Sequence, residues 1–304
     1  MPRIAVSIKA VSRYCVSGMT VQNRPEYSED IPIPLNFLLF EVSQDMNPEY
    51  TYHVFTNEKF DLSGRRIIAR RPDLVVIENE NGESRLIGSL GGTAFYAFYN
   101  EMSDWEAEIQ LSIHKTSDLL FDTVFTSLFA LERRMIKKES LILHCAYVEY
   151  KGQGILFSAP SETGKSTQAD LWNRYRGSCT VNGDRALLRK IDDRWIACGW
   201  PVCGSSEICN LGETPIYAIV MLRQGKKNRV ELLTPFQAFT LLYEQITVNQ
   251  WNKAFVQQAI TLIEDLVGDV PIYQLTCDIS EAAVECLETV LFSENYRDIK
   301  EAGQ

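Results

Sequence analysis

Short apolar runs separated by turn residues make up the first 114 residues, a pattern typical of β-strands. Asn81-Gly82 lies between two of these runs, and this dipeptide predicts a tight hairpin turn. We expect strands at residues 4–8, 37–42, 50–55, 74–77, 85–87, 93–99 and 107–113.

The spacing of apolar residues changes to a helical period after residue 116. Lys137 and Lys138 close this stretch, as suits the negative end of a helix dipole. One amphipathic helix is therefore predicted over residues 117–138. It divides the chain into a β-rich domain at 1–115, a connecting helix at 116–138 and a second domain at 139–304.

Strands and helices are mixed in the second domain, which predicts an α/β fold with a mixed sheet. Two strands should form a hairpin around Asp192-Asp193, and two more a pair around residues 225–228. The expected strands are 141–148, 154–157, 179–181, 186–188, 194–197, 216–222, 230–233 and 272–275, and the expected helices are 167–172, 235–247, 250–267 and 280–292.

Composition limits the class of protein. The 304 residues carry a net charge of −10, which argues against nucleic acid or an anionic membrane as the main partner. The eight cysteines form no CxxC pair, and the three histidines are too scattered for a histidine metal cluster. The N-terminus lacks the apolar core of a signal peptide, and no apolar run is long enough to span a bilayer. We expect a reduced, cytoplasmic protein.

Two arginine pairs, Arg65-Arg66 and Arg70-Arg71, are the one basic cluster in the β-rich half. We interpret them first as a solvated loop. A docking site for an acidic or phosphorylated partner is the alternative.

A phosphate-binding motif stands at residues 159–167, where APSETGKST fits [AG]-x4-G-K-[ST]. A buried strand precedes it and a helix follows, which is the context that the motif requires. Loop N–H groups and the helix N-terminus attract phosphate, Lys165 reaches the terminal phosphates, and Ser166 can bind Mg2+. The predicted nucleotide ligands are Ala159, Ser161, Glu162, Thr163, Gly164, Lys165, Ser166 and Thr167.

Three further residues are candidates for chemistry. Asp184 follows a strand about twenty residues after the lysine, where a second metal-binding carboxylate is expected, although a turn aspartate is the alternative. His144 lies in an apolar strand, either as a hydrogen-bonded core residue or facing the transferred phosphoryl group. Glu207 lies in a Gly/Ser-rich loop, either as a metal ligand or simply exposed.

The sequences LILHCAYV, ILFSAPSETGKST and VNGDRALL together resemble the C-terminal catalytic domain of HPr kinase/phosphorylase. The resemblance covers residues 138–290 and implies a phosphoenolpyruvate-carboxykinase-like phosphate-loop fold. It places Lys165, Ser166 and Thr167 at the nucleotide and Asp184 at the second aspartate of the family's Asp-Asp pair. Gly183 replaces the first aspartate, which in the family is the acid/base for the acceptor hydroxyl. Either Asp184 takes both roles, or another group such as His144 or Glu207 helps, or the enzyme is impaired.

The resemblance implies an ATP-dependent kinase that uses Mg2+. The β-rich half does not match the regulatory domain of the family. The whole is similar to stand-alone HPr-kinase-like proteins found near peptide-modification genes, some of which phosphorylate a serine of a ribosomally made peptide. The acceptor would be a hydroxyl of a peptide or protein, and a homo-oligomer stays open. The alternatives are an ATP-binding module that transfers no phosphate, and a small-molecule kinase.

Overall fold

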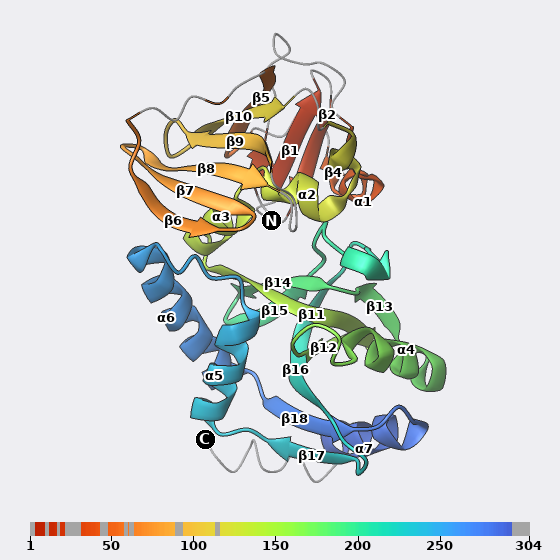
Figure 1. The fold of residues 1–304 in the computed structure, drawn as a ribbon. Coiled ribbons are helices and arrows are strands. Elements are labelled where there is room, and N and C mark those ends of the chain that lie inside the picture. Colours follow the sequence, from red (N-terminus) through yellow and green to blue (C-terminus); the bar gives the residue numbers. More distant parts are fainter. Residues whose placement is uncertain are drawn as a thin grey trace. The chain divides into compact units, whose positions relative to one another are not determined.

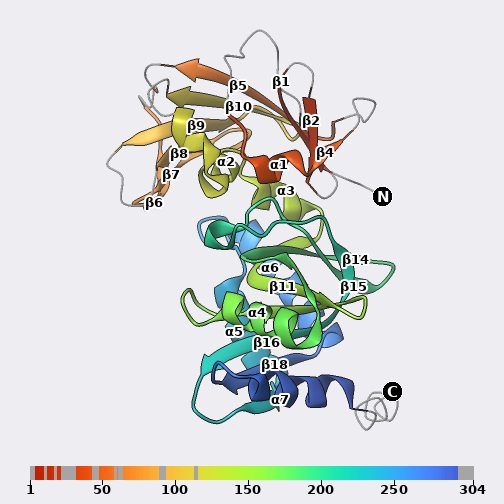
Figure 2. The same cartoon turned by 90° about the vertical axis from the view of Figure 1, so that its right-hand side faces the viewer.

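The structure is a computed structural model that describes residues 4–9, 12–16, 19–21, 32–42, 48–57, 60, 64–88, 94–112 and 116–293. The chain divides into two compact units, Met1–Arg134 and Met135–Gln304. The elements of both units are drawn in Figure 1 and, turned by 90°, in Figure 2.

The first unit contains a four-stranded and a six-stranded sheet, with strand orders β1-β3-β2-β4 and β5-β10-β9-β8-β7-β6. Its elements are β1 (Ile4–Lys9), β2 (Ser12–Val16), β3 (Met19–Val21), α1 (Leu35–Leu38), β4 (Glu41–Val42), β5 (Thr51–Asn57), β6 (Ile67–Arg71), β7 (Leu74–Asn79), β8 (Gly82–Gly88), β9 (Phe95–Glu101) and β10 (Glu106–Ser112). The predicted hairpin is confirmed, but its turn lies one residue earlier than Asn81-Gly82: Asn79 pairs with Gly82, so that Glu80 and Asn81 form the turn. Thr93 and Ile113, at the ends of two predicted strands, lie outside the described residues.

Two predictions for the sheets of this unit are wrong. The strand at 37–42 is instead the short helix α1 followed by β4, because an apolar run of this length suits either structure. The arginine cluster is not wholly a loop, since Arg70 and Arg71 belong to β6.

The single helix at 117–138 is likewise three shorter helices: a 3₁₀-helix at Thr116–Leu120, α2 (Asp122–Ser127) and α3 (Leu131–Lys137). Phe121 is extended and Ala130 is left-handed (φ 46°), so the helix stops twice although the apolar spacing continues.

A buried ionic network joins α3 to the six-stranded sheet. Arg133 donates from Nε and Nη2 to the two carboxylate oxygens of Glu101, both at 2.7 Å, and from Nη1 to Glu83 at 2.9 Å. Arg134 reaches Glu101 at 2.7 Å, and Tyr99 donates to the same carboxylate at 2.9 Å. All five side chains are buried, so each charge depends on its partners.

The second unit is built on an eight-stranded mixed sheet with the order β12-β11-β14-β15-β16-β18-β17, and β13 pairs with β11 off this path. Because β12 also pairs with β16, the strands β11, β12, β14, β15 and β16 close into a ring. The strands are β11 (Ser140–Tyr150), β12 (Gln153–Ser158), β13 (Cys179–Asn182), β14 (Arg185–Ile191), β15 (Arg194–Cys198), β16 (Glu213–Gln224), β17 (Arg229–Leu232) and β18 (Ile272–Cys277).

Helices cover both faces of this sheet: α4 (Lys165–Arg176) and α7 (Glu281–Phe292) on one face, α5 (Pro235–Gln245) and α6 (Lys253–Asp269) on the other (Figure 1). Alternation along β12 explains the two layers. Ile155 and Phe157 pack with Trp172 of α4, whereas Leu156 packs with Leu242 of α5. Because β12 is buried on both faces, its sequence is a continuous apolar run.

The predicted elements of this unit are confirmed with one exception. Asp192 and Asp193 form the turn of the β14–β15 hairpin, both with positive φ. The strands at 216–222 and 230–233, however, do not pair with each other, because β18 lies between β16 and β17. The path through α5 and α6 returns β18 parallel to β16, a long-range pairing that spacing along the chain does not reveal.

No helix in the part of the chain that the structure describes is long and apolar enough to cross a membrane. The seven cysteines whose side chains are described are free thiols, and five of them are buried.

Candidate functional site

The loop at residues 159–164 connects β12 to α4 in a strand–loop–helix arrangement. Gly164 precedes the helix with φ 114°, a conformation that favours glycine, and no side chain caps the helix. The first N–H groups of α4 are therefore open to an anion. Lys165 is 8% exposed, and its Nζ donates to the carbonyls of Ala159 at 3.1 Å and Pro160 at 3.4 Å, which holds the ammonium against the loop.

Gln224, at the end of β16, holds the outer side of this loop. Its Nε2 donates to the carbonyl oxygens of Thr163 at 3.3 Å and Glu162 at 3.5 Å. In a trans peptide the N–H points away from the C=O. Because the carbonyls of Glu162 and Thr163 face Gln224, the N–H groups of the same two peptides point away from Gln224. Glu162 has φ 66°, in the left-handed region, so it occupies a backbone position that glycine would fill with less strain.

Asp184 lies where β11 changes partners. On one side of β11, His144 pairs with Arg185 of β14, whereas Tyr147 pairs with Asn182 of β13. On the β14 side, β13 and β14 follow one another along β11, and the backbone N–H of Cys145 donates to the carbonyl of Asp184 at 3.0 Å. This irregular step between two antiparallel strands brings Asp184 beside His144, next to the strand that leads into the loop.

Asn182 fixes the turn that presents Asp184. Its Oδ1 accepts hydrogen bonds from the backbone N–H groups of Asp184 at 2.9 Å and Arg185 at 2.8 Å. Its Nδ2 donates to the carbonyls of Trp200 at 2.7 Å and Val202 at 3.1 Å. The side chain is fully buried, so it acts as a scaffold for the turn.

Charged groups surround the Asp184 carboxylate. His144 Nε2 lies 3.4 Å from its Oδ1, and Arg185 Nε lies 3.2 Å from its Oδ2. Burial alone would raise the pKa of Asp184, but the hydrogen bond from His144 and the charge of Arg185 hold it below its usual value. Burial lowers the pKa of Lys165, and the nearby Asp184 charge opposes that shift. The site thus keeps one ionised carboxylate close to a buried ammonium.

Gly183 has no room for a side chain. A Cβ on it would lie 2.1 Å from Ser206 Oγ and 2.3 Å from Ser206 Cβ. Ser206 is held in place because its hydroxyl donates to the carbonyl of Cys203 at 2.6 Å. Gly204 in turn lies against Asp184, since a Cβ on it would be 3.1 Å from the Asp184 Cγ. The loop at 203–206 therefore fills the space that an aspartate at position 183 would need.

Most of the predicted catalytic and metal-binding residues lie around the loop, whereas Glu207 lies apart from them. Lys165, His144 and Asp184 come together, and Ser166 is exposed on the first turn of α4. Glu207 is exposed with φ 55°, and no hydrogen bond or ion pair joins it to a described residue of the site. Among the described residues, no group of three or more His, Cys, Asp or Glu side chains could hold a metal ion.

Four residues of the site were not predicted: Asn182, Arg185, Ser206 and Gln224. An Asn two residues before an Asp is a signal for the turn that Asn182 makes. Gln224 and Ser206 reach the site only through the sheet and loop packing, so local sequence carries no signal for them.

Comparisons with known proteins give three results. No curated protein matches the chain. Among solved structures, a Hpr(Ser) kinase/phosphatase from Coxiella burnetii aligns with 53% of this chain and 93% of its own, at 15% identity and a TM-score of 0.31. A similarity that low does not establish a shared fold.

The family comparison is firmer. The model of a family described as SynChlorMet cassette protein ScmC matches residues 109–292, which is more than half of the chain and includes the loop, Lys165 and Asp184. The chain belongs to the ScmC family of SynChlorMet cassette proteins.

Proposed function

We propose that this protein is an ATP-dependent kinase that transfers the γ-phosphate to a hydroxyl, most simply a serine, of a peptide or protein. The observation that carries the proposal is the buried Lys165 held in an uncapped loop–helix turn, within electrostatic reach of the ionised Asp184. The sequence resemblance to the HPr kinase catalytic domain supports the same reading, including a phosphoenolpyruvate-carboxykinase-like phosphate-loop fold for the second unit.

Each group has a defined role in this proposal. Loop N–H groups and the start of α4 bind the phosphate chain, and Lys165 neutralises its terminal phosphates. The Ser166 hydroxyl and the Asp184 carboxylate are oxygen donors of the kind that Mg2+ prefers. A bound Mg2+ would supply positive charge to the phosphates. Glu207 remains a third candidate ligand.

In the transfer itself, the acceptor oxygen bonds to the γ-phosphorus, the bond from that phosphorus to the β–γ bridging oxygen breaks, and ADP leaves. The hydroxyl proton needs an acceptor, and position 183 supplies none. We assign this role to His144: its Nε2–H donates to Asp184 at 3.4 Å, which leaves Nδ1 as the nitrogen that accepts the proton. Phosphoryl transfer depends more on positioning and charge than on a strong base, so a weak proton acceptor is sufficient.

The test is incubation of the purified protein with Mg·ATP and serine-containing peptides, followed by mass spectrometry. The proposal predicts a mass gain of one phosphate that Lys165→Ala abolishes. It also predicts that His144→Gln lowers the rate about a hundredfold or more, the usual contribution of a positioned proton acceptor. Unaltered transfer in Lys165→Ala would refute the mechanism.

A second function is favoured by one observation: Ser206 occupies the space of the acid/base carboxylate. The protein would then bind ATP and a peptide without transferring phosphate. Saturable binding of Mg·ATP together with no phosphate gain on any serine, threonine or small-molecule hydroxyl supplied would favour this binding module over the kinase.

A further inference from the structure

Strand β6 forms an outer edge of the six-stranded sheet in the first unit. Within the described parts of the chain, it pairs with β7 on one side and ends the strand order there. Alternate residues of an antiparallel strand turn their N–H and C=O groups away from the neighbour. The register with β7 shifts between Ile67 and Ala69, so the regular part of this edge is Ala69–Arg71. An edge of this kind is a template for one more strand.

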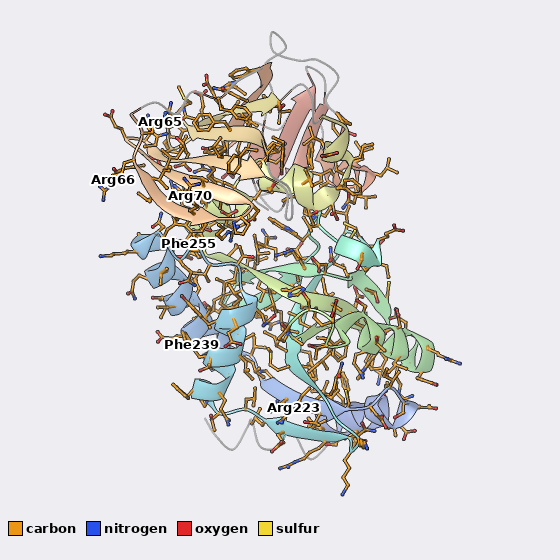
Figure 3. All side chains as sticks on the ribbon, in the orientation of Figure 1. Arg65, Arg66, Arg70, Arg223, Phe239 and Phe255 are labelled. Carbon is orange, nitrogen blue, oxygen red and sulfur yellow. The ribbon has the colours of Figure 1, made fainter. Side chains whose placement is uncertain are left out.

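The side chains of this edge are unusually accessible. Ile67 is 47% exposed and Ile68 is 41% exposed, although isoleucine is normally buried. The arginines 65, 66, 70 and 71 are also exposed. Four positive charges within seven residues, on a protein with a net charge of −10, make a basic and apolar strip. Arg65, Arg66 and Arg70 are labelled along this edge in Figure 3.

The charges of Arg66 and Arg70 are available to a ligand, whereas Arg71 pairs with Asp73 at 3.1 Å. Arg66 forms an ion pair with Glu78 at 3.3 Å, but both side chains are more than half exposed. Exposed pairs of this kind contribute at most about 1 kcal/mol, so a carboxylate of a ligand can compete for the arginine. Arg65 is exposed, but its guanidinium reaches inward over the sheet, where it lies 5.1 Å from the centre of the Phe98 ring of β9. Arg70 forms no ion pair with any described residue.

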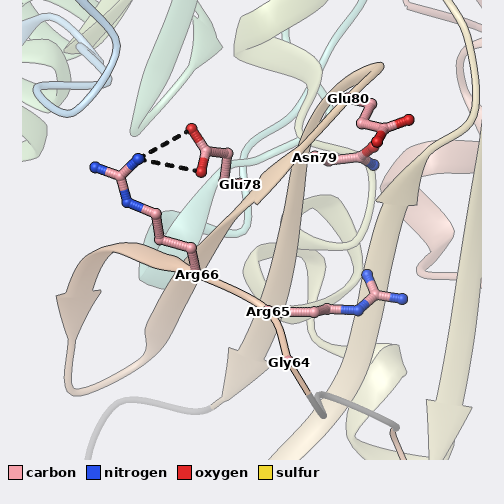
Figure 4. A pocket seen from close by; sticks show the side chains of 6 residues that line it. All are labelled: Gly64, Arg65, Arg66, Glu78, Asn79 and Glu80. Carbon is pink, nitrogen blue, oxygen red and sulfur yellow. Dashed lines mark hydrogen bonds and ion pairs between the residues drawn. The ribbon is translucent and has the colours of Figure 1, made fainter.

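An open cavity of about 480 Å³ lies at the start of this strip, lined by Gly64, Arg65, Arg66, Glu78, Asn79 and Glu80. Arg65 and Arg66 point to opposite sides of the chain there (Figure 4).

We propose that the β6 edge binds an extended acidic peptide segment, which adds to the sheet as a further strand. Backbone hydrogen bonds to β6 would give the strand pairing, Ile67 and Ile68 would contact apolar side chains of the peptide, and Arg66 and Arg70 would select for its carboxylates. If the protein phosphorylates a peptide, as proposed above, this segment is the part of the substrate that the first unit recognises.

Fluorescence anisotropy with a fluorescein-labelled peptide of alternating glutamate and valine tests the proposal. The measurement uses the full chain carrying Lys165→Ala, without nucleotide, so that phosphotransfer plays no part. Saturable binding is expected, and Arg70→Glu should weaken it by at least about tenfold because a repulsive charge replaces an attractive one. The matched control is Arg194→Glu, an exposed arginine of the second unit, which should leave binding unchanged. Circular dichroism confirms that both variants fold.

Control peptides separate strand addition from simple charge attraction. A peptide with glutamine in place of glutamate should bind weakly. Two acidic peptides, N-methylated on one or the other alternate set of residues, should differ, because one set of N–H groups must face β6. Equal binding of both methylated peptides, or no binding of the acidic peptide, would overturn the proposal. Binding of a labelled single-stranded oligonucleotide in place of the acidic peptide would also overturn it.

The two proposals fail separately. Phosphate transfer without binding at β6 would remove the docking proposal and leave the kinase. Peptide binding that Arg70→Glu weakens, with no transfer in the wild-type protein, would keep the docking site and remove the kinase.

Discussion

At the scale of single residues, the site depends on keeping one carboxylate charged in a partly buried place. Asp184 is 25% exposed, and burial by itself would favour its neutral form. His144 and Arg185 reverse that preference through contacts at 3.4 and 3.2 Å. In the proposed kinase, Asp184 would have to stay ionised at neutral pH to bind the metal, and these two neighbours favour its ionised form.

The lowered pKa of Asp184 makes a prediction about stability. Because the pKa is lower in the folded than in the unfolded chain, ionised Asp184 stabilises the fold above the unfolded-state pKa, and this contribution is lost as the pH falls through the folded-state pKa. The difference in unfolding free energy between wild type and Asp184→Asn should therefore be constant near neutral pH and shrink in acid. Urea denaturation at a series of pH values measures it. A difference that grows as the pH falls would contradict the prediction.

At the scale of elements, short loops shape the site as much as the strands do. The loop at 203–206 presses Ser206 against Gly183 and Gly204 against Asp184. The loop therefore leaves no space for a carboxylate side chain at position 183. Gly183 and Ser206 are packed against each other there.

This packing can be tested by a double-mutant cycle. Gly183→Asp should destabilise the protein by about 1–3 kcal/mol, as overpacking usually does. Ser206→Gly should relieve much of that cost when the two changes are combined, because it removes both atoms that a Cβ at 183 would meet. Denaturant unfolding of the two single variants and the double variant measures the coupling. Strictly additive effects would show that the two residues do not compete for space.

The buried ionic network of α3 gives a second prediction at this scale. Glu101→Ala leaves Arg133 and Arg134 buried without their shared carboxylate, which should cost about 3–5 kcal/mol. Glu78→Ala, which breaks the exposed pair with Arg66, is the matched control and should cost about 1 kcal/mol or less. Comparable losses of unfolding free energy in the two variants would contradict the importance of the network.

At the scale of the whole molecule, the candidate site around Lys165 and the β6 strip belong to different units. We therefore expect nucleotide binding and peptide binding to be separable. Arg70→Glu should leave the affinity for Mg·ATP unchanged within error. Isothermal titration calorimetry measures this, and a large change in nucleotide affinity would show that the two sites are coupled.

The sequence predicts best those features that are local. The strand–loop–helix turn around Lys165 and the hairpin at Asp192-Asp193 follow from motif and turn chemistry, and both are confirmed. The single helix at 117–138 is wrong because apolar spacing persists across Phe121 and Ala130, where the backbone leaves the helix. The order β16-β18-β17, the closing of Ser206 over Gly183 and the contact of Gln224 with the loop depend on residues distant in the chain, which no local pattern records.

The central claim is that the turn carrying Lys165 binds a nucleotide triphosphate with its metal. Titration of Mg·ATP into the wild-type protein, followed by calorimetry, tests it most directly. The account predicts a saturable heat of binding that is lost in Lys165→Ala, with the thermal unfolding of the uncomplexed variant little changed. No heat and no saturation in the wild type, or equal affinity in Lys165→Ala, would contradict it.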